Sequence, residues 1–219
     1  MVSAILYDDI TTVRRDLLST FKWAALLGVW LPLACATVNE ITPGVRVHVT
    51  PQVEPEQTAT SAQWIEEIDK VVKTGDWLVV RAYTSADDAV VIATNIPLSH
   101  VAVYDAEKDR VIEARWLGVS ARPMKEFIDH AHRVLVIRPK WHNEVAAKTA
   151  MDFASSLIGS GYDFGGLIGF GTDQRYYCSE LAVQIYRESF KAEEHVPRVV
   201  EPGQLFLWGK VLFDSGFRN

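Results

Sequence analysis

The strongest constraint on the fold is a strand–turn–strand pattern in the middle of the chain. Residues 99–106 (SHVAVYDA) alternate between apolar and polar side chains, AEKD follows as a turn, and RVIEARWLGV returns as a second extended segment. With the turn near residues 107–109, Val103 and Tyr104 pair approximately with residues 111–113. The sequence therefore predicts an antiparallel β-hairpin.

Further strands and helices surround this hairpin. WLVVRAY and VLVIRP have the composition of buried strands, and Pro202-Gly203 predicts a turn before a last strand. Apolar residues recur at helical spacing in residues 61–72, 124–133 and 142–159, and again after Cys178, whereas SADDAVVIATNIPL fits neither pattern. We expect an α+β fold, with a mainly antiparallel sheet packed against helices. The apolar positions that define the face of the 142–159 helix are Val145, Ala146, Ala150, Phe153, Ala154, Leu157 and Ile158.

The N-terminal segment has the pattern of an export signal. Arg14, Arg15 and Lys22 precede residues 23–36 (WAALLGVWLPLACA), which carry no charge and end in Ala-Cys-Ala. This apolar run is shorter than the roughly 20 residues that a membrane-spanning helix needs. Cys35 also fits the lipidated cysteine of a bacterial lipoprotein signal. The alternative is a buried N-terminal helix of a cytoplasmic protein.

We therefore divide the chain into a leader, a tether and one domain. Residues 1–36 are expected to be a signal peptide or lipoprotein leader, and residues 37–60, rich in Thr, Pro and Val, a tether in which VRVHV is a short strand. Residues 61–219 form the predicted domain. The expected location is the bacterial periplasm or cell envelope, with a membrane tether if Cys35 is lipidated; the alternative is cytoplasmic.

Composition excludes one large class of function. The chain of 219 residues is 48% hydrophobic and 23% charged, which is an ordinary globular balance. Its formal net charge is −6, and no run of Lys or Arg provides the basic face with which proteins bind nucleic acid. We therefore expect no nucleic-acid partner.

Cys178 is the residue on which a functional reading depends. It is one of two cysteines, and it remains the only unmodified thiol once the leader is removed or lipidated. It follows a Gly-rich connector and begins an amphipathic helix, where unpaired N–H groups and the helix dipole stabilise a thiolate and a tetrahedral oxyanion. The alternative is an inert core cysteine.

A thiolate also needs a base, and the base needs an orienting group. Among the six histidines, His100 alone begins a strand with apolar neighbours, which fits either a fixed imidazole or a satisfied core histidine. Glu113 lies across the hairpin in an apolar strand, where a carboxylate needs a partner; the alternative is an exposed residue of an edge strand. His130 and His132 form a His-x-His pair on an expected surface helix with no third ligand, so no metal is predicted.

These residues together resemble a known family. Residues 162–186 (YDFGGLIGFGTDQRYYCSELAVQIY) are similar to the nucleophile segment of NlpC-type cell-wall peptidases, but here the histidine precedes the cysteine. That order resembles the circularly permuted papain-like amidases of the YaeF/YiiX type, distant relatives of lecithin:retinol acyltransferase. The resemblance covers residues 74–215 and rests on Gly75-Asp76, Ser99-His100-Val101, Glu113, Tyr162-Asp163, Tyr177-Cys178-Ser179-Glu180 and the segment Glu201-Pro202-Gly203-Gln204-Leu205.

The resemblance implies a permuted papain-like fold and a set of roles. Cys178 would be the nucleophile, His100 the base and Glu113 the orienting group, with Tyr162, Tyr177 and Ser179 near the substrate or the oxyanion. The implied reaction needs no cofactor: amide hydrolysis in a peptide or peptidoglycan stem through a thioester acyl-enzyme. One departure is residues 85–98, which lack the basic or aromatic loop expected before the histidine.

Two alternatives remain open at this point. One is a lipid or ester acyl hydrolase or acyltransferase that uses the same triad, with Trp77, Phe164, Phe170 and Trp208 lining an acyl groove, although aromatic residues belong more often to a core. The other is an envelope binding module that keeps the fold and has lost turnover. The speed of thiol alkylation at neutral pH distinguishes an active site from a core cysteine.

Overall fold

The computed structural model describes residues 55–172 and 174–218, with side chains from residue 58. A six-stranded sheet in the order β4-β3-β2-β1-β5-β8 forms its centre, and all of its neighbouring strands are antiparallel. The predicted α+β fold with a mainly antiparallel sheet is confirmed. The strands are β1 (Trp77–Ala82), β2 (His100–Asp105), β3 (Arg110–Arg115), β4 (Gly118–Pro123), β5 (Ala131–Pro139) and β8 (Gly209–Asp214).

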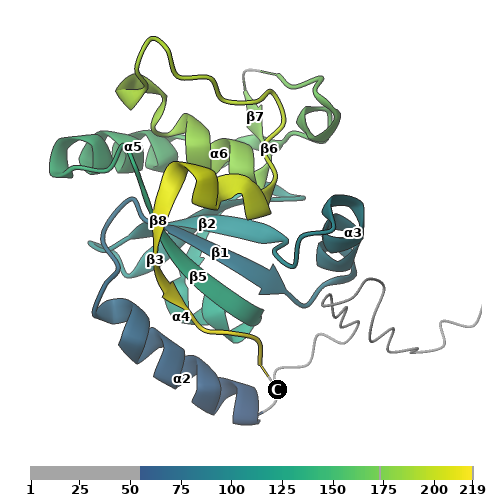
Figure 1. Ribbon diagram of the computed structural model, residues 1–219, viewed down its shortest axis with the longest axis vertical. Coiled ribbons are helices and arrows are strands. Elements are labelled where there is room, and N and C mark those ends of the chain that lie inside the picture. Colours follow the sequence, from purple (N-terminus) through teal and green to yellow (C-terminus); the bar gives the residue numbers. More distant parts are fainter. Residues whose placement is uncertain (1–54, 173, 219) are drawn as a thin grey trace, which may run out of the picture. The chain divides into compact units, whose positions relative to one another are not determined.

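Helices cover both faces of this sheet (Figure 1). α5 and α6 pack on one face, where Ala150 and Leu181 share a core with Val79 and Val103. α2 and α4 cover the other face, and the side chains there alternate with the first set along each strand. The helices are α2 (Pro55–Asp69), α3 (Ser85–Thr94), α4 (Met124–Asp129), α5 (Glu144–Ser156) and α6 (Cys178–Gln184), with 3-10 turns η2 (Gly166–Ile168), η3 (Arg187–Ser189) and η4 (Pro202–Trp208).

The central hairpin has the predicted register. Val103 lies opposite Ile112 and Tyr104 opposite Val111, with Asp105 paired to Arg110 at the turn. The chain then reverses again after Arg115, which pairs with Gly118, so that β4 continues the hairpin as a third strand. The sequence predicted one strand and not two here, because only residues 116–117 interrupt the RVIEARWLGV segment.

Two buried hydrogen bonds fasten α6 to the sheet. The indole Nε1 of Trp77 donates to the carbonyl of Ala182 at 2.9 Å. The Tyr186 hydroxyl donates to the carbonyl of Gly75, also at 2.9 Å. Gly75 has φ +87°, in the left-handed region that favours glycine. The second half of α6 and the residues that follow it are therefore held at a fixed place over the sheet.

Several local predictions differ from the structure. α2 begins at Pro55 and not at residue 61, so residues 55–60 of the expected tether are helical; proline is favoured at a first helical position. The ambiguous segment after β1 forms α3, which Thr84 caps. His132 was expected on a surface helix, but it is buried in β5, at the point where the register with β1 shifts as in a β-bulge.

Only some of the apolar positions predicted for α5 face the core. Ala146, Ala150 and Ala154 face the core, as predicted. Val145 is 76% exposed and Phe153 40% exposed, so neither belongs to the core face. The helix therefore packs through small side chains, which let its backbone approach the sheet closely.

The leader and the VRVHV segment lie outside the described residues. In the part of the chain that the structure does describe, no helix is both long and apolar enough to cross a bilayer.

Candidate active site

Cys178 is the first residue of α6 and lies in the core between this helix and the sheet. Cys178 is 8% exposed, and α6 packs against β2 and β3. The residues on either side are anchored to one backbone position: the Tyr177 hydroxyl accepts from the N–H of Val200 at 2.9 Å, and the Ser179 hydroxyl donates to the Val200 carbonyl at 2.6 Å. What the structure shows for Tyr177 and Ser179 is thus a positioning role. Their contact with substrate or oxyanion stays a prediction.

His100 is the first residue of β2, and its ring is fixed on several sides. Its Nε2 lies 2.6 Å from Oε2 of Glu113, and its ring lies 6.0 Å from that of Phe127 in α4. Burial alone would lower the pKa of His100. The charge of Cys178 and a hydrogen bond with it, followed by the same two interactions with Glu113, raise that pKa to about 10. Because Nε2 is taken by Glu113, Nδ1 is the ring nitrogen left to share a proton with the sulfur.

Glu113 is the partner that holds this tautomer. Its side chain is 0% exposed, and Arg122 Nε and Arg115 Nη1 lie 2.7 Å and 3.5 Å from its Oε1. Burial would raise the pKa of this carboxyl, but the hydrogen bond and charge of His100, then the charges of Arg122 and Arg115, lower it to about 2. The carboxylate is therefore ionised over the whole physiological range. The alternative of an exposed edge-strand glutamate is wrong.

Arg122 is a member of this cluster that the sequence analysis missed. It comes from β4, where Ser120 is the direct partner of Glu113 and Arg122 lies two residues further along the strand. Its Nη2 donates to Glu113 Oε2 at 3.2 Å. The signal that would have found it is the second reversal at residues 116–117, which brings a third strand beside Glu113.

Tyr162 lies near enough to Cys178 for the charge of the cysteine to act on its phenol. It belongs to β6 (Gly161–Tyr162), which pairs in parallel with β7 (Arg175–Tyr176). Burial, followed by the negative charge of Cys178, raises the pKa of the Tyr162 phenol, so this hydroxyl stays protonated and can donate a hydrogen bond. The charge of Cys178 thus acts on the Tyr162 phenol, and contact of this hydroxyl with the substrate or the oxyanion stays a prediction.

Asp163 shapes the Gly-rich connector beside this tyrosine. Its carboxylate accepts from the N–H groups of Gly166 and Thr172 at 2.9 Å and 3.0 Å. A Cβ added at Gly166 or at Gly171 would lie 2.8 Å or 2.9 Å from Asp163 Oδ2. Gly166 and Gly171 therefore let the loop close around the Asp163 carboxylate.

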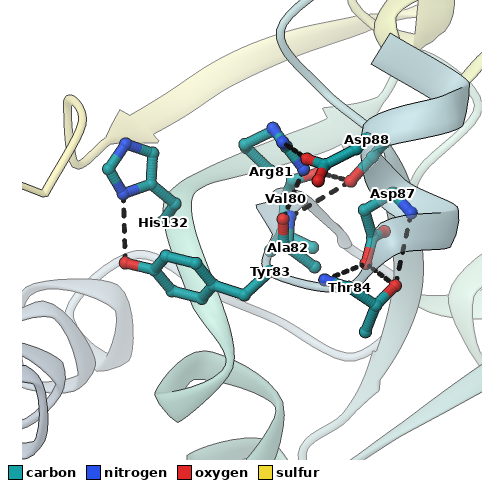
Figure 2. A network of polar contacts seen from close by, with 9 residues as sticks. Val80, Arg81, Ala82, Tyr83, Thr84, Asp87, Asp88 and His132 are labelled. Atoms are coloured by element: carbon teal, nitrogen blue, oxygen red, sulfur yellow. Dashed lines mark hydrogen bonds and ion pairs between the residues drawn. The ribbon is translucent and has the colours of Figure 1, made fainter. Parts of the chain in front are cut away.

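The segment between β1 and His100 is a compact acidic helix with no basic or aromatic loop. Figure 2 shows Asp88 pointing back to the buried Arg81 and Asp87 to Thr84, which caps α3. At the far end of the segment, the Ser99 hydroxyl accepts from the N–H of Ala82 at 3.1 Å. These contacts fix the backbone that leads directly into His100. The same figure shows Tyr83 and His132 pointing toward each other, with the phenol oxygen 3.0 Å from Nδ1.

The four aromatic residues named for an acyl groove divide into two pairs. Trp77 and Trp208 are core residues. Phe164 and Phe170 are 60% and 74% exposed on the Gly-rich connector, and the Phe164 ring lies 4.8 Å from that of Tyr162. Only the second pair is available to a ligand.

The sequence of this chain matches one known protein family. A profile of the family described as permuted papain-like amidase enzymes (YaeF/YiiX, C92 family) matches residues 37–205. The chain belongs to this family. The expected amidase family is therefore confirmed, as is the permuted papain-like fold class that goes with it. In keeping with the permuted amidases, the candidate histidine precedes the cysteine in this chain.

Other comparisons add less to the family assignment. A crystal structure of the metalloprotein YiiX from Escherichia coli O157:H7 is similar to this chain with a TM-score of 0.46 and 24% identity. The match covers 54% of this chain and 66% of that one, just under two thirds of its length. No curated protein matches the chain. Among residues 55–172 and 174–218, no three His, Cys, Asp or Glu side chains group as a metal site requires.

Proposed function

We propose that the protein is a cysteine-dependent amidase that works through Cys178, His100 and Glu113. The observation that carries the proposal is the position of one imidazole, which hydrogen-bonds to a buried, ionised carboxylate and lies near enough to Cys178 for the charge of the cysteine to raise its pKa. This is the nucleophile–base–orienter arrangement of acyl-transfer enzymes. Family membership supports the amide as the bond attacked.

The first half of the reaction forms an acyl-enzyme. The Cys178 thiolate attacks the amide carbonyl carbon and forms a C–S bond, while the carbonyl π electrons move to oxygen. As the tetrahedral intermediate collapses, the C–N bond breaks and His100 gives its proton to the leaving nitrogen. Because the pKa of His100 is raised to about 10, the imidazolium is already charged at neutral pH when the substrate arrives.

The second half returns the free enzyme. Neutral His100 takes a proton from water, whose oxygen attacks the thioester carbon, and the C–S bond then breaks to release the carboxylic acid product. The anionic oxygen of both tetrahedral intermediates would be received by backbone N–H groups at the start of α6 and by the protonated hydroxyl of Tyr162. These oxyanion contacts belong to the proposal.

A peptide or peptidoglycan stem is the proposed substrate, with an acyl lipid or ester as the second candidate. The observation that favours the second is the apolar surface next to Tyr162, where Phe164, Ile168 and Phe170 are exposed. The proposal also places the protein in the bacterial cell envelope, on the strength of the basic and apolar pattern in residues 14–36 and of a lipidation signal at Cys35.

Intact-protein mass spectrometry tests this function directly. The protein is incubated separately with peptidoglycan fragments, peptides and phospholipids and then quenched in acid, which preserves a thioester. A mass increase equal to one acyl group, located on Cys178 and missing from Cys178→Ala, supports the proposal, and the acyl group names the substrate class. Absence of an adduct with every class, together with no product release, favours a silent binding module.

A further inference from the structure

The carboxylate that orients His100 is shared with two arginines. His100 Nε2 and Arg122 Nη2 contact the same oxygen, Oε2 of Glu113, at 2.6 Å and 3.2 Å. The other oxygen, Oε1, faces Arg122 Nε at 2.7 Å and Arg115 Nη1 at 3.5 Å. With the Glu113 side chain fully buried, water screens little of its charge, so the two arginines act on it together with the His100 imidazolium.

Arg122 is itself fixed in place. Its side chain is 15% exposed, and its guanidinium lies 5.0 Å from the centre of the Phe127 ring. The same ring contacts His100, so one aromatic side chain supports both partners of Glu113. The exposed Glu126 in α4 lies 3.8 Å from Arg122 Nη1. The charged and titratable groups around the histidine are therefore Cys178 of α6, Glu113 and Arg115 of β3, Arg122 of β4, Glu126 of α4 and Tyr162 of β6.

The two halves of the proposed reaction make opposite demands on His100. Before acylation it pairs with an anionic sulfur and should be charged. After acylation the sulfur is a neutral thioester, and the imidazole, which has given its proton to the leaving nitrogen, must stay neutral until it accepts a proton from water. A buried carboxylate with no counter-charge would hold a proton on the ring.

We infer that Arg122 is a positioning residue for this second half: by neutralising part of the charge on Glu113, it keeps His100 from holding its proton too tightly to activate water. Arg115 adds a weaker contribution from 3.5 Å. The claim that Arg122 serves the second half of the reaction rests on the proposed function. The claim that Arg122 offsets the charge of Glu113 rests on the geometry alone.

The sign of the effect follows from electrostatics. Removing a positive charge near a base makes protonation of that base easier, provided that Glu113 stays ionised. Arg115 and the imidazolium remain beside Glu113 when Arg122 is replaced, so the carboxylate keeps its charge at neutral pH. Arg122→Met should therefore raise the pKa of His100, and Arg122→Lys, which keeps the charge, should leave it close to its starting value.

Nuclear magnetic resonance measures this without a substrate. The imidazole of His100 is titrated in Cys178→Ala, which lacks the thiolate as the acyl-enzyme does, and the signal is assigned from a His100→Gln spectrum. Adding Arg122→Met should move the titration midpoint up by about one pH unit or more. Adding Arg115→Met should move it in the same direction by less, and this more exposed position serves if Arg122→Met does not fold.

Arg133 provides a matched control in the same protein. It binds Asp214 through Nε and Nη2 at 2.9 Å and 2.5 Å, and it lies 4.9 Å from the Phe217 ring centre, so it repeats the arrangement of Arg122 away from the site. Arg133→Met should leave the His100 midpoint unchanged. If the Arg122→Met protein folds and its His100 titration midpoint is unchanged or lower, the inference is overturned. A rise without any acyl adduct in the mass spectra would leave the effect of Arg122 on His100 standing and would remove the proposed function, and with it the role in deacylation.

Discussion

His100 and Glu113 bind each other diagonally across two neighbouring strands. The register that pairs Val103 with Ile112 continues to place Glu113 two residues from the direct partner of His100, and the Nε2–Oε2 distance is 2.6 Å. Diagonal neighbours on one face of an antiparallel pair are within reach of long side chains. A one-residue slip of the hairpin would move Glu113 to the opposite face, so the turn at residues 106–109 fixes the candidate site as well as the sheet.

Glu113→Gln should reduce turnover strongly without unfolding the protein. The amide keeps the size of the carboxylate but not its charge, so it neither stabilises the imidazolium nor fixes the tautomer. We expect kcat to fall by about 100-fold or more, by analogy with the orienting carboxylate of other triads. Steady-state kinetics measure this on the substrate class identified by the acyl adduct.

Asp105→Asn is the control for that experiment. Asp105 is also a buried carboxylate bound to an arginine of the same hairpin, with Arg110 Nε at 2.8 Å, but it lies at the opposite end of β2 from His100. Its replacement should lower stability and leave kcat unchanged. If both variants lose activity equally, loss of a buried ion pair explains the effect and Glu113 has no special role.

Cys178→Ala should abolish acyl transfer and change stability little. The side chain is small and lies at the edge of the core, so the free energy of unfolding should stay within about 1 kcal/mol of wild type. Urea denaturation and product formation are measured on the same preparation. Turnover by this variant comparable to wild type would refute the nucleophile assignment.

The ion pair should make stability depend on pH in a defined direction. Glu113 has a pKa lowered from 4.5 to about 2, so its contribution is present above pH 4.5 and is lost as the pH falls through 2. His100 has a pKa raised from 6.5 to about 10, so its contribution is present below pH 6.5 and is lost as the pH rises through 10. Denaturant unfolding between pH 5 and 2 should show a smaller decline for Glu113→Gln than for wild type. Equal declines would mean that Glu113 does not titrate as described.

Gly75→Ala should destabilise the protein more than Gly159→Ala. Both glycines have positive φ, +87° and +96°, so each alanine carries a backbone strain of about 1 kcal/mol. Only at Gly75 would the new Cβ meet another group, the Tyr186 hydroxyl at 2.2 Å. Loss of that hydroxyl's bond to Gly75 adds about 1 kcal/mol or more. Equal losses of unfolding free energy for the two variants would show that the Tyr186 contact does not hold α6.

The local sequence pattern predicted the parts of the site that lie within one hairpin or at the start of one helix. The alternation and turn of the hairpin gave the relation between His100 and Glu113, and the amphipathic run after Cys178 placed the cysteine at a helix start. Both signals depend only on residues that are neighbours in the sequence. The proximity of the sulfur to the imidazole depends on tertiary packing and came from the family resemblance.

The parts that could not be predicted depend on pairing between elements. Arg122 joins the site only because β4 returns beside β3, and His132 is buried because α4 ends at Asp129 and β5 begins at Ala131, so that this residue lies in the sheet. The fit of α5 to the sheet through Ala146 and Ala150, with Val145 exposed, is likewise set by the close approach of two backbones. Periodicity alone does not record how near a helix lies to its sheet.

The most direct test of the central claim is the rate of alkylation of Cys178 against pH, in wild type and in His100→Ala. Iodoacetamide is small enough for a partly shielded thiol, and peptide mass spectrometry separates Cys178 from Cys35. If His100 activates the sulfur, Cys178 of the native wild-type protein should be alkylated faster near neutral pH than Cys178 of His100→Ala. Superimposable curves, or a thiol that reacts only after unfolding, would contradict the account.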